Sequence, residues 1–181
     1  MKRANTFFAL LAVAMVITSC APKLIPFTQS IREEFKLSEA DLQTLQFYIS
    51  HEIILNRAES ADSKQGNVDG VLTIETGREL EQVGFEVGEK GIVKSVPSDN
   101  KLRVVFEQDD PEGLMFGIAN RAVNERYSLM SPKWEGSRGK VTYKGETYYT
   151  SKRSGDSYLM IRMKKVHKLQ KSRRDVKGMK I

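Results

Sequence analysis

The chain of 181 residues has a single cysteine, Cys20, and only two histidines, His51 and His167. One cysteine cannot form an intrachain disulfide, and zinc sites built from several cysteines are excluded with it. The longest apolar run, residues 7–17, is shorter than the roughly 20 residues that a membrane-spanning helix needs. No G-x-S-x-G nucleophile motif, P-loop or dinucleotide-binding glycine pattern occurs. We therefore expect no enzyme activity, no metal and no cofactor.

Hydrophobic residues make up 40% of the chain and charged residues of both signs 29%. A chain of this size and composition can form one globular core without disulfides or metals. Collagen-like, mucin-like and strongly acidic disordered chains are excluded by the same composition.

The N-terminal segment has the organisation of an export signal. Lys2 and Arg3 precede the apolar run of residues 7–17, a length typical of a signal-peptide core. Ile17-Thr18-Ser19-Cys20 follows and resembles the lipobox of bacterial lipoproteins. The resemblance implies that residues 1–19 are a signal peptide and that Cys20 is acylated, with chains such as palmitate. The alternative is a chance cysteine near a transmembrane anchor.

Ala21-Pro22-Lys23 follows the cysteine, with no Asp at the second mature position. In the lipoproteins that the lipobox resembles, such an Asp marks retention in the inner membrane. The resemblance therefore implies lipid anchoring in the outer membrane, at its periplasmic face.

Basic charge is concentrated at the C-terminal end. Residues 162–181 hold nine Lys or Arg against one Asp, whereas residues 20–161 hold 18 Lys or Arg against 22 acids. Such a segment can bind an anionic polymer, an anionic lipid or an acidic protein surface, or remain a solvated tail. Export makes nucleic acid an unsuitable partner. The candidate binding residues are Lys164, Lys165, Lys168, Lys171, Arg173 and Arg174.

The sequence predicts one helix near the start of the mature chain. Ser38 suits the N-cap, Asp41 stands three residues later, and Leu37 and Leu42 have hydrophobic-staple spacing. We predict a helix over residues 37–50 and favour a strand for residues 53–57. Residues 20–36 are expected to be a linker from which Phe27 and Ile31 can pack on the body.

Alternating apolar residues and frequent turn signals predict seven or eight short strands between residues 71 and 165. The clearest hairpin is predicted at Lys144-Gly145, between strands 140–143 and 146–150. The fold class is thus mainly β, a small antiparallel β-barrel or sandwich, with an SH3-like barrel as one form, preceded by one N-terminal helix. Residues 37–165 would form the single β-rich domain and residues 166–181 a basic tail.

Segments of the chain also resemble a group of small uncharacterised lipoproteins from Bacteroidetes-type bacteria. The resemblance rests on Pro22-Lys23, 25–28, Asp41-Leu42, 46–48, 140–143 and 147–149. It implies no activity.

Few side chains indicate chemistry. Tyr143 and Tyr149 could pair across the predicted hairpin as a platform for sugars or peptides, or simply pack between strands. Asp109, Asp110 and Glu112 indicate a solvated hairpin tip, and a calcium site there would need further ligands. His51-Glu52 lacks the second histidine of a zinc-protease motif, because residue 55 is Leu.

These observations predict a non-catalytic lipoprotein that binds an envelope protein complex or an anionic envelope polymer. The alternative is a hydrolase of envelope glycan or peptidoglycan that uses carboxylates and the tyrosines concentrated near Trp134, which are Tyr143, Tyr148, Tyr149 and Tyr158.

Overall fold

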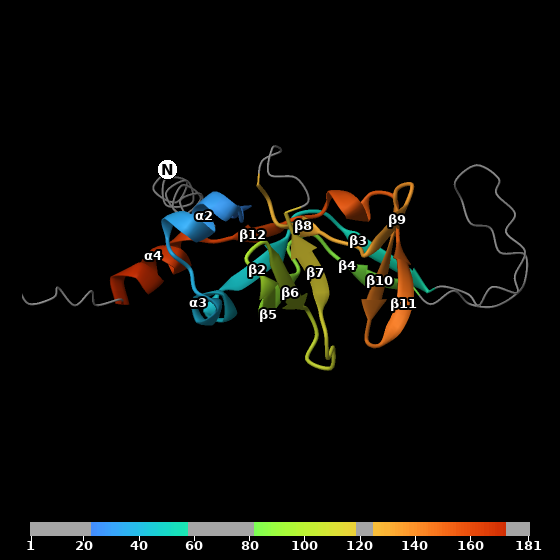
Figure 1. The fold of residues 1–181 in the computed structure, drawn as a ribbon, viewed down its shortest axis with the longest axis horizontal. Coiled ribbons are helices and arrows are strands. Elements are labelled where there is room, and N and C mark those ends of the chain that lie inside the picture. The colour runs from blue at the N-terminus through green and yellow to red at the C-terminus, as the bar shows by residue number, and fades with distance from the viewer. Residues whose placement is uncertain (1–22, 58–81, 119–124, 173–181) are drawn as a thin grey trace, which may run out of the picture.

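Strands dominate the structure, a computed structural model that describes residues 23–57, 82–118 and 125–172 (Figure 1). They form two antiparallel sheets, of seven and five strands. The predicted mainly β, antiparallel fold is confirmed, but the sheets do not form a closed barrel. None of the described helices is long and apolar enough to cross a membrane. Several predictions concern residues outside the described ranges: the signal peptide 1–19, Cys20, the strand near 71–74, Arg173 and Arg174.

The seven-stranded sheet joins the first and last described strands. Its order is β1 (Ile25–Pro26), β12 (Leu159–Ile161), β2 (Gln46–Ile49), β5 (Lys90–Ser98), β6 (Lys101–Val105), β7 (Leu114–Gly117) and β8 (Ser128–Leu129). An isolated bridge between Ser128 and Tyr158 brings β8 back toward β12. The sheet is therefore strongly curved, with its two edge regions in contact at single residue pairs.

The five-stranded sheet is built around the predicted hairpin. Its order is β4 (Gln82–Phe85), β3 (Ile53–Arg57), β11 (Glu146–Thr150), β10 (Arg138–Tyr143) and β9 (Lys133–Glu135). Lys144 and Gly145 both have positive φ, 48° and 81°, as a two-residue turn between twisted strands requires. The hairpin and the strand at residues 53–57 were both predicted correctly.

A row of five aromatic rings connects the two sheets. Phe116 of β7 contacts Phe106, which contacts Phe85 of β4, and the row continues through Tyr143 to Tyr148. All contacts are edge-to-face, with centroids 5.3 to 6.2 Å apart, the arrangement that the ring quadrupoles favour. The hydrophobic core is thus continuous between the sheets.

One short helix and a strand occupy residues 37–50, for which a single helix was predicted. α3 (Glu39–Thr44) begins at Ser38 with the expected capping box, in which Asp41 N donates to Ser38 Oγ and Ser38 N to Asp41 Oδ2. It ends at Leu45, because residues 46–49 form β2. The apolar spacing of residues 46–49 is compatible with a helix, but these residues form a strand because they pair with both β5 and β12.

The segment expected to be a linker is part of the fold. α2 (Gln29–Glu34) begins at Thr28, whose Oγ1 accepts a hydrogen bond from Ile31 N. Phe27 is fully buried, and its ring lies 5.1 Å from that of Phe47 and 4.9 Å from that of Tyr127. The predicted packing of Phe27 on the body is confirmed, and the linker can extend only over the residues before β1.

Candidate functional site

The basic C-terminal segment includes a helix, α4 (Met163–Ser172), where the sequence predicted a strand to residue 165 and then a tail. Val166 is fully buried in the core, and Met163 and Leu169 pack against it. The ring of His167 meets Phe35 edge-on at 5.4 Å. The apolar residues interrupting the basic charge therefore fix α4 on the body.

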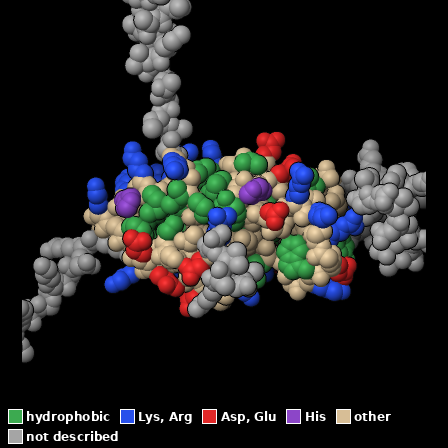
Figure 2. All heavy atoms as spheres, turned by 90° about the horizontal axis from the view of Figure 1, so that it is seen from above, with side chains coloured by type: hydrophobic (Ala, Val, Ile, Leu, Met, Phe, Trp, Pro, Cys, Tyr) green, Lys and Arg blue, Asp and Glu red, His purple; other side chains and the backbone are tan. Residues whose placement is uncertain are grey.

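Four predicted binding residues, Lys164, Lys165, Lys168 and Lys171, are exposed on α4. The helix contains no Asp or Glu, and within the described ranges none of the four forms an ion pair. Figure 2 shows Lys and Arg side chains gathered at the end of the molecule that carries α4, beside a patch of hydrophobic side chains. The helix thus presents an array of cations whose counter-charge must come from outside the described chain.

Tyr143 and Tyr149 do not form the predicted cross-strand pair. The turn sets Tyr143 opposite Glu146 and Tyr149 opposite Lys140, so the two tyrosines lie on opposite faces of the sheet. Tyr143 is buried and its ring lies 6.0 Å from that of Tyr148, whereas Tyr149 is half-buried on the other face. An aromatic platform made of both residues is therefore ruled out.

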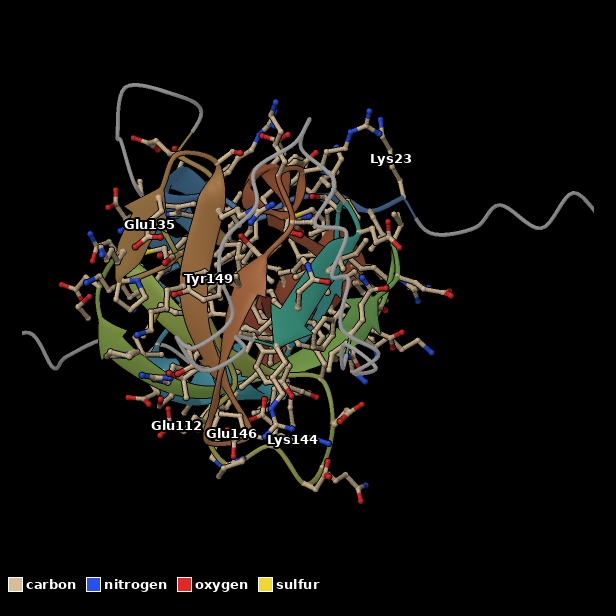
Figure 3. The ribbon with its side chains drawn as sticks, turned by 90° about the vertical axis from the view of Figure 1, so that its right-hand side faces the viewer. Lys23, Glu112, Glu135, Lys144, Glu146 and Tyr149 are labelled. Atoms are coloured by element: carbon tan, nitrogen blue, oxygen red, sulfur yellow. The ribbon has the colours of Figure 1, made fainter. Side chains whose placement is uncertain are left out.

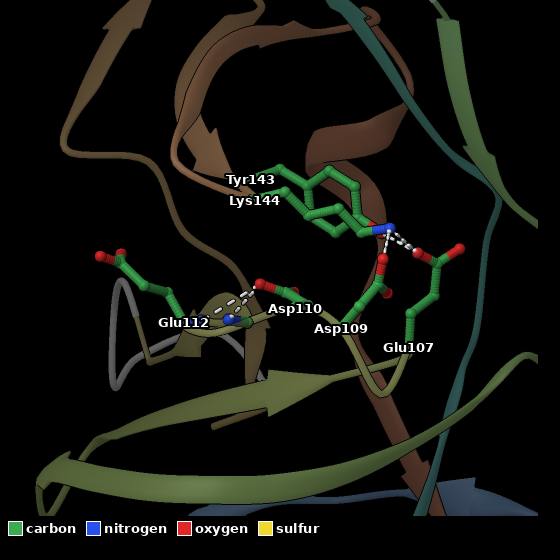
Figure 4. A network of polar contacts seen from close by, with 7 residues as sticks. Glu107, Asp109, Asp110, Glu112, Tyr143 and Lys144 are labelled. Atoms are coloured by element: carbon green, nitrogen blue, oxygen red, sulfur yellow. Dashed lines mark hydrogen bonds and ion pairs between the residues drawn. The ribbon is translucent and has the colours of Figure 1, made fainter.

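Instead, Tyr143 joins a polar cluster between the two sheets, which we call the clasp: Glu107, Asp109, Tyr143 and Lys144 (Figure 4). Tyr143 Oη donates to Glu107 Oε2 at 2.7 Å. Lys144 Nζ lies 2.5 Å from Glu107 Oε2 and 2.7 Å from Asp109 Oδ2. The clasp connects the β6–β7 loop to the tip of the β10–β11 hairpin.

Mutual hydrogen bonding stabilises the charged forms in the clasp. The hydrogen bond from Lys144, followed by that from Tyr143, lowers the pKa of Glu107, and Lys144 also lowers the pKa of Asp109. The two carboxylates raise the pKa of Lys144, while burial and then Glu107 raise the pKa of Tyr143. A carboxylate held ionised beside a lysine is a poor proton donor at neutral pH. The clasp links the two sheets through two ion pairs and a hydrogen bond.

Asp110 departs from the predicted solvated tip. It is 2% exposed, and its Oδ1 accepts hydrogen bonds from the backbone N–H groups of Glu112 and Gly113. Glu112 is exposed and pairs with Arg103 at 3.4 Å. The turn is thus organised around one buried carboxylate. Among the described residues, no group of His, Cys, Asp and Glu is arranged to hold a metal ion.

A shallow, open depression of about 500 Å³ lies beside the clasp. Its apolar residues include Ile92, Val105 and Phe106, and Lys90 and Lys94 also line it, with Glu107 and Asp110. Strand pairing brings together the residues at the bottom of the depression, because Ile92 of β5 lies opposite both Gln46 and Val105 on the exposed face of the sheet. Nothing in the sequence pattern signalled it, because β2 comes from a segment far from the β5–β6 hairpin.

The predicted binding residues therefore lie in two separate places. α4 lies at one end of the molecule and the β10–β11 hairpin toward the other (Figure 1). Viewed along the long axis, Lys23 lies on one side, and Lys144, Glu146 and Glu112 lie together on the opposite side (Figure 3). The α4 lysines and the clasp cannot contact one compact ligand at the same time.

Fold and surface define a two-sheet antiparallel β protein with a cationic C-terminal helix. Comparison with family models, with curated proteins and with solved structures finds no match. The function must therefore be argued from the surface and the sequence.

Proposed function

We propose that the protein is a non-catalytic lipoprotein of the bacterial cell envelope, anchored by acyl chains on Cys20 at the periplasmic face of the outer membrane. In this proposal it binds an envelope protein complex or an anionic envelope polymer. It needs no metal or cofactor and does not bind nucleic acid. An SH3-like relationship of residues 88–106 would be compatible with a binding role.

The observation that carries the proposal is the cationic surface of α4. Lys164, Lys165, Lys168 and Lys171 are exposed on a helix that Val166 fixes to the core. Because the helix is already ordered, binding an anion there costs less conformational entropy than ordering a free tail. Attraction of this kind weakens as the salt concentration rises.

The test is a pull-down of the acylated protein from envelopes in mild detergent, at low and high salt. The key variant carries Lys164→Gln, Lys168→Gln and Lys171→Gln. Its matched control carries Lys94→Gln, Lys140→Gln and Lys152→Gln, which remove the same charge from exposed positions on other elements. Cys20→Ala tests the anchor.

We expect a stoichiometric protein or an anionic polymer to be retained by the wild type and the control, and lost from the α4 variant. Equal recovery by all three would contradict the proposal for α4. Turnover of peptidoglycan that is lost with Glu107→Gln or Asp109→Asn would instead support the envelope hydrolase. Extraction of the wild type and Cys20→Ala without detergent would argue against lipid anchoring.

A further inference from the structure

The start of the described chain and the cationic helix lie at the same end of the fold. β1 runs antiparallel to β12, with Ile25 opposite Ile161 and Pro26 opposite Met160. Lys23, the first described residue, precedes Ile25 by two residues, and Met163, where α4 begins, follows Ile161 by two. The chain enters the domain beside the helix that carries the lysines.

Little chain separates this point from the acyl group. Cys20 precedes Lys23 by three residues, which reach at most about 10 Å when fully extended. On the proposed function, lipid headgroups therefore lie within about 10 Å of Lys23, and the start of α4 is one strand spacing of about 5 Å further. Exposed charges are largely screened beyond the Debye length of about 8 Å at physiological ionic strength, so the short tether lets the lysines reach the membrane and attraction acts once α4 is close to it.

The lysines share the outward side of the helix. At 100° per residue, Lys164, Lys168 and Lys171 lie within about 60° of one another, opposite buried Val166. The acids of neighbouring α2, Glu33 and Glu34, form no ion pair with them in the described chain. Their charges therefore remain available to a surface.

Apolar residues beside the lysines suit the same surface. Leu24, Ile25, Pro26 and Met163 are half-buried, and Figure 2 shows hydrophobic side chains bordered by basic ones at this end. Basic residues next to exposed apolar ones are typical of surfaces that rest in the headgroup region of a bilayer. The opposite side carries Glu112 and Glu146 beside Lys144 (Figure 3), and these carboxylates pair with Arg103 and Arg57.

We infer that α4 binds the anionic phospholipid headgroups of the leaflet that holds the acyl chains. The domain then lies with α4 and β1 against its own membrane and directs the β10–β11 hairpin away from it. The inference rests on the proposed lipid anchor and assigns lipid headgroups to α4 in place of a protein or polymer.

The test measures distance from the bilayer at two positions in the acylated protein. Acylation consumes the thiol of Cys20, the only cysteine, so one introduced cysteine can be labelled with a fluorophore. Ser172→Cys reports from the exposed end of α4 and keeps every lysine. Thr142→Cys reports from the exposed face of β10. The proteins are reconstituted into vesicles that carry a headgroup-attached quencher, either with about 30 mol% phosphatidylglycerol or with phosphatidylcholine alone.

In anionic vesicles we expect several-fold stronger quenching at residue 172 than at residue 142. The difference should largely disappear in phosphatidylcholine vesicles, at high salt and in the Lys164→Gln, Lys168→Gln, Lys171→Gln background. It should persist in the control background described above. Equal quenching at both positions, or quenching at residue 172 that does not depend on the lipid charge, would overturn the inference.

Vesicle flotation separates this inference from the anchor on which it rests. Acylated protein that floats with the vesicles but shows no preferential quenching refutes only the membrane-facing role of α4. Protein that fails to float, or that floats equally well as Cys20→Ala, refutes the anchor. Loss of quenching when soluble peptidoglycan fragments are added would show that a polymer, not the lipid, is the preferred partner of α4.

Discussion

Replacing Tyr127 by Phe removes one hydroxyl group that connects three parts of the chain. Tyr127 is fully buried, and its Oη donates to Gln29 Oε1 at 2.5 Å. The carbonyl oxygen of Asp99 lies 3.0 Å from the same hydroxyl. Arg32 Nη1 donates a hydrogen bond to the Tyr127 hydroxyl at 3.1 Å. The hydroxyl therefore links α2 to the β5–β6 turn and to the segment before β8.

The free-energy cost of Tyr127→Phe depends on which groups lose a hydrogen-bond partner when the hydroxyl is removed. Gln29 is only 9% exposed, so its side-chain oxygen would lose a partner that water cannot easily replace. An unsatisfied buried acceptor costs about 1–3 kcal/mol, whereas the more exposed Arg32 and Asp99 groups can bond to water. We expect Tyr127→Phe to lower the free energy of unfolding by about 2 kcal/mol. For a domain of this size, that is a fall in Tm of about 4–8 °C.

Urea denaturation monitored by circular dichroism measures the change, with Tyr48→Phe as the matched control. Tyr48 is 6% exposed, and no described hydrogen bond uses its hydroxyl, so the control should change stability by less than about 0.5 kcal/mol. If Tyr127→Phe is no more destabilising than the control, the hydroxyl does not tie α2 to the sheet. Residues 23–36 would then be closer to the linker that the sequence predicted.

Alkaline pH gives an independent measure of the same group. Burial raises the pKa of Tyr127, and the hydrogen bond from Arg32 only partly opposes this. Because the folded-state pKa lies above the unfolded value of about 10, the contribution is complete below pH 10 and is lost as pH rises through the folded value. Stability of the wild type should thus fall above pH 10, and Tyr127→Phe should reduce the slope. An unchanged slope would count against a buried, neutral hydroxyl.

Three further changes test other parts of the structure by denaturant titration. Gly113→Ala should lower the free energy of unfolding by about 2–3 kcal/mol, because φ is +74° and the added Cβ would lie 2.6 Å from the Val104 carbonyl oxygen. Gly145→Ala, where the added Cβ meets open space, should lower it by about 1 kcal/mol. Equal losses in the two variants would contradict the clash at residue 113. Val166→Ala should cost about 2 kcal/mol by leaving a cavity under α4, and a neutral result would mean that the helix is not docked. Glu107→Gln should flatten the loss of stability on acidification below about pH 4.5. Because the pKa of Glu107 is lowered in the folded state, its contribution to stability is present above the ordinary pKa of 4.5 and is lost as pH falls through the folded-state pKa. An acid profile identical to that of the wild type would show that the clasp does not stabilise the fold.

Local signals in the sequence identified local structure. The Lys144-Gly145 turn and the Ser38–Asp41 capping box were both predicted, because each depends on a few neighbouring residues. Segment 46–49 was assigned incorrectly, because its strand conformation depends on pairing with β12 and β5, far away in the chain. The pairing of Tyr143 with Tyr149 failed for a simpler reason, since a two-residue turn leaves them out of register.

The candidate site was predicted in part. Four α4 lysines were identified from charge alone, but their helical arrangement was not, because no N-cap signal precedes Met163 and the ordering contact is made by Val166 with a distant core. The clasp could not be predicted, because Glu107 and Tyr143 are 36 residues apart and meet only when the two sheets pack. The depression likewise depends on the lateral order of β2, β5 and β6.

On the proposed export route, the pairing of β1 with β12 has a consequence for the order of events during secretion. β1 has no other neighbour in its sheet, and β12 also lies beside β2. A chain that emerges from a translocation pore with its N-terminal side first therefore exposes β1 and β2 long before their shared partner arrives. Contacts between such distant segments form slowly, and unpaired strand edges invite aggregation in the interval. Completion of the seven-stranded sheet must wait for β12, so on this proposed route a chain that stalls or is cut before residue 159 would leave both early strands without that partner.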